Sequence, residues 1–192
     1  MTAAAGDEPM AAAAEDDAPA GAGGRVSKLV KNGALVEDGF VDASGAETLP
    51  AAGPLIVSLE QWQAHREILR ARAEPLGLRL RSDQSPEPIA GDVEHFDVIA
   101  LEFPKFRDGR AYSYARLLRE RYGYSKELRA VGDVLLEQLH FMMRVGFDAF
   151  EIEDPDPLAA FRAAAADFSV WYQPTGDGRP TAMELRRARR SS

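Results

Sequence analysis

The sequence contains no cysteine. This absence excludes disulfides, catalysis by a thiolate and cysteine-ligated iron–sulfur clusters. A redox reaction would therefore need a bound cofactor, or a partner protein that transfers the electrons. The sequence leaves the cofactor unknown and does not exclude flavin, whose phosphate can be held by several unrelated types of loop.

Long apolar runs and a basic N-terminus are also missing. No run of about 18 apolar residues occurs, so we expect no membrane span. Residues 1–24 contain no Lys or Arg, whereas secretory signals and transit peptides need basic residues. We therefore expect a cytoplasmic protein.

The same N-terminal segment, residues 1–24, is rich in Ala, Gly and acidic residues, and we predict that it is disordered. It holds five acidic residues and no basic one, so the remaining chain has a net charge of −3 rather than −8. Proteins that bind nucleic acids usually show a clear basic excess. The charge balance therefore argues against a nucleic-acid partner.

Metal and nucleotide motifs are absent as well. His65, His95 and His140 lie far apart and match no spacing of metal ligands, so no metal site is expected. The only glycine cluster, residues 21–24, lies in the tail and does not follow a strand. It is therefore no dinucleotide-binding fingerprint.

What the sequence does contain is a hairpin signal followed by alternating strands and helices. In residues 25–53, Asn32 and Gly33 separate two short apolar runs, which predicts a β-hairpin before a linker. In residues 54–173, short apolar strands are expected at residues 55–57, 78–80, 97–103, 128–131 and 147–152. Helices are predicted to begin after Ser58, near Arg110, at Asp133 and after Asp156.

This alternation predicts an α/β domain with a mainly parallel sheet. About five strand–helix steps are too few for an eight-fold barrel. We expect an open three-layer sheet, with a partial barrel-like arc as the alternative. Residues 174–192 contain several arginines, and we predict a flexible basic tail.

In a parallel sheet, ligands bind at the carboxyl ends of the strands. Three segments should meet there: residues 102–110, 132–133 and 153–156. Lys105, Arg107 and Arg110 lie before or at a helix start, where cations and free backbone amides could form a pocket for a small oxyanion. The alternative is a solvated basic loop.

Two acidic residues at the same edge are candidates for proton transfer. Asp133 follows Gly132 at a strand end, although a role as helix N-cap would also explain it. Glu102 is a candidate by its position before the basic loop. The sequence assigns neither a catalytic role.

Residues 105–129 carry a net charge of +5 and several tyrosines. Interleaved basic and aromatic residues can bind nucleic acid. Here the helical spacing of Tyr114 and Tyr122 explains the pattern better, with arginines on the solvated face. Docking to an acidic redox partner stays open.

Four motifs in fixed order carry a family resemblance: residues 103–113 (FPKFRDGRAYS), 117–124 (LLRERYGY), 128–134 (LRAVGDV) and 146–150 (GFDAF). They resemble a bacterial family of unknown function whose genes lie beside those for assimilatory sulfite reductase. Its members are commonly labelled probable oxidoreductases. The resemblance covers about residues 26–172, and Arg107 stands where similar sequences often have Thr.

The resemblance implies an accessory protein of assimilatory sulfite reduction, with sulfite reductase or a related sulfur-assimilation enzyme as partner. Two alternatives stay open. One is an oxidoreductase or other α/β enzyme that acts on a small oxyanion with a bound cofactor. The other is an anion-binding module without turnover.

Overall fold

The structure is a computed structural model that describes residues 28–105, 108–166 and 182–190. One eight-stranded sheet has the order β2-β1-β8-β7-β6-β5-β4-β3. Its strands are β1 (Lys28–Lys31), β2 (Ala34–Val36), β3 (Val41–Asp42), β4 (Leu55–Ser58), β5 (Leu76–Leu80), β6 (Val98–Phe103), β7 (Glu127–Gly132) and β8 (Ala149–Ile152). Strands β3 to β8 are parallel, and β1 pairs antiparallel with β8 and β2.

The helices follow the strands in alternation. They are α1 (Leu59–Arg70), α2 (Arg110–Arg116), α3 (Leu139–Arg144), α4 (Pro157–Ala166) and α5 (Ala182–Arg190). Short helical turns are η1 (Glu87–Ile89), η2 (Val93–His95), η4 (Leu136–Gln138) and a π-type turn, η3 (Leu117–Arg121), that extends α2.

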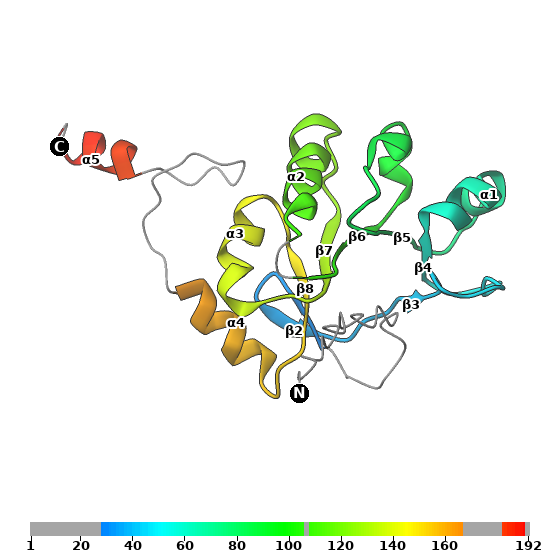
Figure 1. The fold of residues 1–192 in the computed structure, drawn as a ribbon, viewed down its shortest axis with the longest axis horizontal. Helices are drawn as coiled ribbons and strands as arrows, with labels where there is room; N and C mark the ends of the chain where they lie inside the picture. Colours follow the sequence, from blue (N-terminus) through cyan, green and yellow to red (C-terminus); the bar gives the residue numbers. More distant parts are fainter. Residues whose placement is uncertain (1–27, 106–107, 167–181, 191–192) are drawn as a thin grey trace, which may run out of the picture.

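The sheet curls into an arc with α1, α2 and α3 along its outer side (Figure 1). Parallel strands β4 to β8 neighbour one another in chain order, so right-handed crossovers bring their helices to the same face. The α/β class, the mainly parallel sheet and the N-terminal hairpin are thus confirmed. The arc replaces the open three-layer form, which needs helices on both faces.

The hydrophobic core lies between the outer face of the sheet and the helices. Alternate strand residues point into it, since side chains of a strand alternate between faces. The α1 residue Trp62 is 1% exposed and packs edge-on against Phe96, with ring centroids 4.7 Å apart. The core residues of the central strands include Val57, Leu78, Leu101, Leu128 and Phe150.

Local sequence signals behave as predicted at the hairpin and at two helix starts. Asn32 (φ 50°) and Gly33 (φ 76°) form the turn between β1 and β2 with two positive φ angles. Ser58 and Gln61 form a complete capping box at α1. The Asp156 carboxylate accepts a hydrogen bond from Ala159 N (3.1 Å) at the start of α4.

The helix predicted to begin at Asp133 starts later, at Leu136 in η4, and continues as α3. Gly132 has φ 88° and the backbone N–H of Asp133 donates to Phe103 O (2.7 Å). These constraints keep the backbone non-helical after β7 ends, and Leu135 is still extended. Asp133 is therefore not a helix N-cap.

Two elements were not predicted. Strand β3 has only two residues, too few for a sequence pattern. Helix α5 lies in the segment expected to be a basic tail. The predicted disordered tail, residues 1–24, lies outside the described residues. None of the helices in the described ranges is long and apolar enough to cross a lipid bilayer.

We predict that Gly132→Ala destabilises the fold by about 2–4 kcal/mol. Its φ of 88° is unfavourable for alanine, and a Cβ would lie 2.6 Å from Phe103 O. Gly91→Ala is the matched control, because a Cβ there meets no atom within 4 Å, and we expect a change below about 0.5 kcal/mol. Urea denaturation of both variants measures the difference; equal midpoints would contradict the prediction.

Candidate functional site

The inner face of the sheet, opposite the helices, carries charged side chains. They alternate along the strands with core residues: Arg79 lies between Leu78 and Leu80, both fully buried in the core. The same alternation places charges on the inner face of four strands, namely Arg79 of β5, Glu102 of β6, Glu127 and Arg129 of β7, and Glu151 of β8.

Arg129 is the centre of this face. Its side chain is 1% exposed, and three carboxylates surround its guanidinium. The shortest nitrogen–oxygen distances are 2.6 Å to Asp38, 2.8 Å to Glu127 and 3.4 Å to Glu151. Lys31 Nζ also lies 2.7 Å from Glu127 Oε2. A buried guanidinium needs such partners, because it stays charged.

Arg79 forms a second, more exposed set of ion pairs. Its guanidinium lies 2.7 Å from Asp42 Oδ2 and 3.3 Å from Glu102 Oε2, and its side chain is 27% exposed. Arg79, Ala100 and Arg129 stand opposite one another on three adjacent strands. The two arginines are therefore about 10 Å apart along the sheet, with only a small side chain between them.

A crossing segment, residues 37–40, connects β2 at one sheet edge to β3 at the other. Asp38 in this segment holds Arg129 with two hydrogen bonds, 2.6 and 3.2 Å long. Asp42, directly after it in β3, holds Arg79. Two aspartates four residues apart thus tie the crossing segment to two arginines of the inner face.

Negative charge is in excess on this face. Five carboxylates (Asp38, Asp42, Glu102, Glu127 and Glu151) meet three cations (Lys31, Arg79 and Arg129). Burial raises the pKa of Glu151 above its usual value, although Arg129 partly opposes this effect. Burial alone would also raise the pKa of Asp42, but hydrogen bonds from Ser44 and the charge of Arg79 lower it.

The predicted oxyanion pocket lies at the carboxyl edge of the parallel strands. Lys105 is exposed, and Arg107 lies outside the described residues. Arg110 is 54% exposed but already paired: its Nε and a terminal nitrogen donate to Asp108 at 2.9 and 2.6 Å. The same group donates to Ser82 Oγ (3.2 Å). Hydrogen bonds from Arg110 and Ser82 hold the pKa of Asp108 well below its usual value.

The two proton-transfer candidates lie in different places. Glu102 is on the inner face and is paired with Arg79, whereas Asp133 is exposed at the end of β7. Glu153 is exposed after β8. No three His, Asp or Glu side chains within the described ranges are arranged to hold a metal ion. The sequence interpretation missed Arg79 and Arg129, although a charged residue inside an apolar strand was a visible signal.

A protein-family model described as "Bacterial protein of unknown function (DUF934)" matches residues 77–183, more than half of the chain. The chain belongs to this family. No curated protein matches it significantly. The family region spans β5 to β8, and therefore includes Arg79, Arg129 and the whole of the predicted anion loop.

We predict that Arg129→Met destabilises the protein by about 3–5 kcal/mol, because it leaves buried carboxylates without their cation. Arg116→Met is the control: Arg116 forms an exposed pair with Glu120, and we expect a change below about 0.5 kcal/mol. Equilibrium unfolding in urea measures both. A stable Arg129→Met variant would mean that the carboxylates find other compensation.

We also predict that Asp108→Asn creates a sulfate site by releasing Arg110. At a sulfate concentration about ten times the Kd of the new site, sulfate should raise the Tm of this variant by about 3–6 °C more than that of the unchanged protein. Adding Arg110→Ala to Asp108→Asn should remove the extra shift.

Sulfate binding by the unchanged protein would contradict this prediction and support the predicted oxyanion pocket. In that case the unchanged protein would show a saturable sulfate shift, and Lys105→Ala with Arg110→Ala would abolish it. Differential scanning fluorimetry at constant ionic strength distinguishes the two outcomes.

Proposed function

We propose that the chain is an accessory protein of assimilatory sulfite reduction that acts by docking to sulfite reductase or a related sulfur-assimilation enzyme. The resemblance carried by residues 103–113, 117–124, 128–134 and 146–150 supplies the pathway. The geometry supports a docking role because the described arginines of the candidate site are neutralised within the fold.

The neutralisation of Arg110 is the observation that carries this proposal. Its contacts with Asp108 form a bidentate pair, which is the strongest arrangement available to a guanidinium. An incoming oxyanion would have to displace that carboxylate. Arg79 and Arg129 are each held by at least two carboxylates, so an anion would meet an excess of negative charge on the inner face.

The composition supports the same assignment. Without cysteine, the chain cannot relay sulfur or electrons through a thiol of its own. A docking protein needs no such group, because the partner performs the chemistry. In the basic, tyrosine-containing segment formed by α2 and η3, Arg116, which is paired with the exposed Glu120, and Arg121 lie at the surface, where they could contact an acidic partner.

A catalytic role is the second candidate, and the environment of the Glu151 carboxyl group favours it. Burial raises its pKa, as is typical of groups that exchange protons in enzymes. Glu151 on β8 and Glu102 on β6 both lie on the inner face, on either side of β7. An enzyme that acts on a small oxyanion with a bound cofactor would use these two carboxylates.

We predict that the full chain forms a complex with sulfite reductase at about 50 mM salt and loses it at about 0.5 M, because salt screens contacts between surface charges. Gel filtration of the mixed proteins measures the complex. Arg116→Glu with Arg121→Glu should weaken it, whereas Lys28→Glu on β1 is a control with an equal change per site.

The absorbance spectrum of the freshly purified chain separates the two candidates. A colourless protein that forms the complex supports the docking role. A flavin or haem band, together with no complex at any salt concentration, would contradict the docking role and support the catalytic role.

A further inference from the structure

A groove of about 650 Å³ lies between α1 and the segment that follows β3. Residues 47–51 form one wall, and the other consists of α1 with residues 71–74. This volume is within the range of sites that bind small ligands or a few side chains of a peptide. The groove is remote from the carboxyl-edge loop that carries Arg110.

Two side chains hold the walls of the groove in place. Near the start of α1, Gln61 Nε2 donates to Ala43 O and Ala46 O, both at 2.8 Å. Beyond the other end of the helix, the Arg72 guanidinium donates to three backbone oxygens, Pro50 O (3.1 Å), Ala51 O (3.2 Å) and Gly53 O (2.8 Å). The groove is therefore preformed, which lowers the entropic cost of binding.

The groove is apolar and carries an exposed isoleucine. Ile68 of α1 is 70% exposed, whereas its neighbour Leu69 is 3% exposed. Leu49 contributes from the opposite wall. Exposed apolar side chains that line a groove commonly mark a protein interface.

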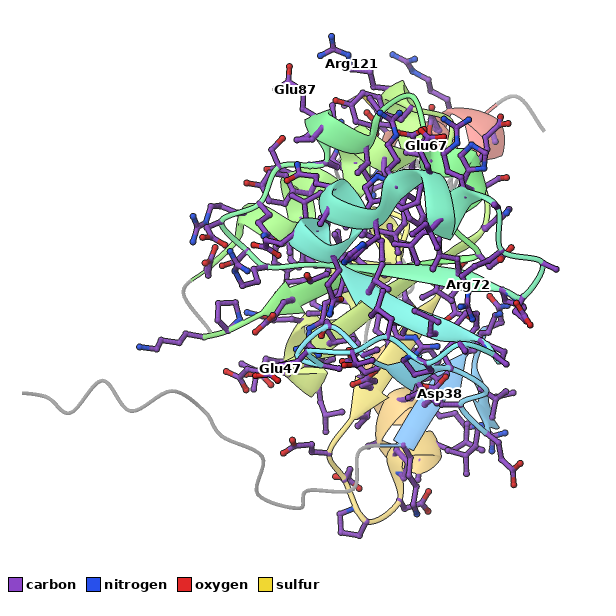
Figure 2. The ribbon with its side chains drawn as sticks, turned by 90° about the vertical axis from the view of Figure 1, so that its right-hand side faces the viewer. Asp38, Glu47, Glu67, Arg72, Glu87 and Arg121 are labelled. Carbon is purple, nitrogen blue, oxygen red and sulfur yellow. The ribbon has the colours of Figure 1, made fainter. Side chains whose placement is uncertain are left out.

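The charges around the groove are mainly negative. Glu47 and Glu74 line it, and Glu67 lies next to Ile68 on α1. Figure 2 views this end of the molecule, with Glu47, Glu67 and Arg72 labelled. Arg72 also lines the groove, and its guanidinium, which donates to backbone oxygens, lies 3.9 Å from Glu74 Oε2. Glu47 and Glu67 are therefore the acidic side chains that an occupant would meet. The groove therefore suits an occupant that combines apolar and basic side chains.

Helix α5 has this composition. It contains four arginines and one glutamate in nine residues, and Met183 is 65% exposed. Figure 1 shows α5 and α1 at opposite ends of the long axis of the molecule. Contact between α5 and the groove therefore joins two copies more readily than two parts of one copy.

We propose that α5 of one copy docks in the α1 groove of a second copy. Met183 packs on Ile68 and Leu49, and Arg186 and Arg187 of α5 face Glu47 and Glu67. Because the two surfaces differ and lie at opposite ends, the contact is head-to-tail and leads to a ring or a chain of copies.

Sedimentation velocity of the full chain over a range of concentrations tests this contact. The expected result is reversible self-association, which Ile68→Glu weakens by at least about tenfold. Leu35→Glu is the matched control, because Leu35 is also an exposed apolar residue (47%) but lies on β2 at the other sheet edge. Equal loss in both variants would overturn the proposal.

A mixing experiment shows whether the contact joins two copies. Arg186→Glu with Arg187→Glu should also prevent self-association. This variant keeps an intact groove, and Ile68→Glu keeps an intact α5, so an equimolar mixture should form a 1:1 complex.

Two results would overturn the proposal: no complex in the mixture, or an unchanged chain that stays monomeric at every concentration. If that monomer still binds a synthetic peptide of residues 181–192 through Ile68, the occupant is the chain's own α5 or a partner protein. None of these measurements involves sulfite reductase, so their outcome is independent of the proposed function.

Discussion

The buried guanidinium of Arg129 constrains much of the structure. It cannot lose its charge, so carboxylates must stay beside it. Glu127 and Glu151 come from the sheet itself, but Asp38 reaches it only because the crossing segment passes from one sheet edge to the other. That path brings the chain to β3 beside β4. The wall of the α1 groove follows directly from β3, so one ion-pair cluster organises both the inner face and a distant surface.

The elements of the fold could be predicted because their signals are local. Asn32–Gly33, the Ser58–Gln61 capping box and the apolar strands depend on neighbouring residues alone. The choice between an arc and three layers depends on strand order, which no local pattern contains. Asp133 shows the limit of a local rule: it has a favourable residue type for an N-cap, but hydrogen bonding across to Phe103 keeps the chain extended beyond it.

For the charged residues of the site, too, local position could be predicted but contacts between distant residues could not. Arg110 was identified from its place after a buried strand, but its pairing with Asp108 depends on side-chain orientation, which spacing does not determine. The pattern Glu127–Leu128–Arg129 inside an apolar strand could have indicated a charged inner face. The convergence of Asp38 on Arg129 could not, since the two residues are far apart in the chain. Because these ion pairs lie inside the fold, we propose that partner recognition uses other surfaces, such as α2 with η3 and the α1 groove.

The hairpin of β1 and β2 joins the sheet at β8, so that Lys28 lies opposite Ile152. During synthesis, β1 must therefore wait for β8, which is made more than 100 residues later. Until then, Leu29 and Val30, which are buried in the finished protein, have no neighbouring strand on the β8 side. Pairing of such distant segments is slow, and a nascent chain with an unpaired strand is prone to aggregate. The sheet can therefore be completed only after the chain has been synthesised at least as far as β8.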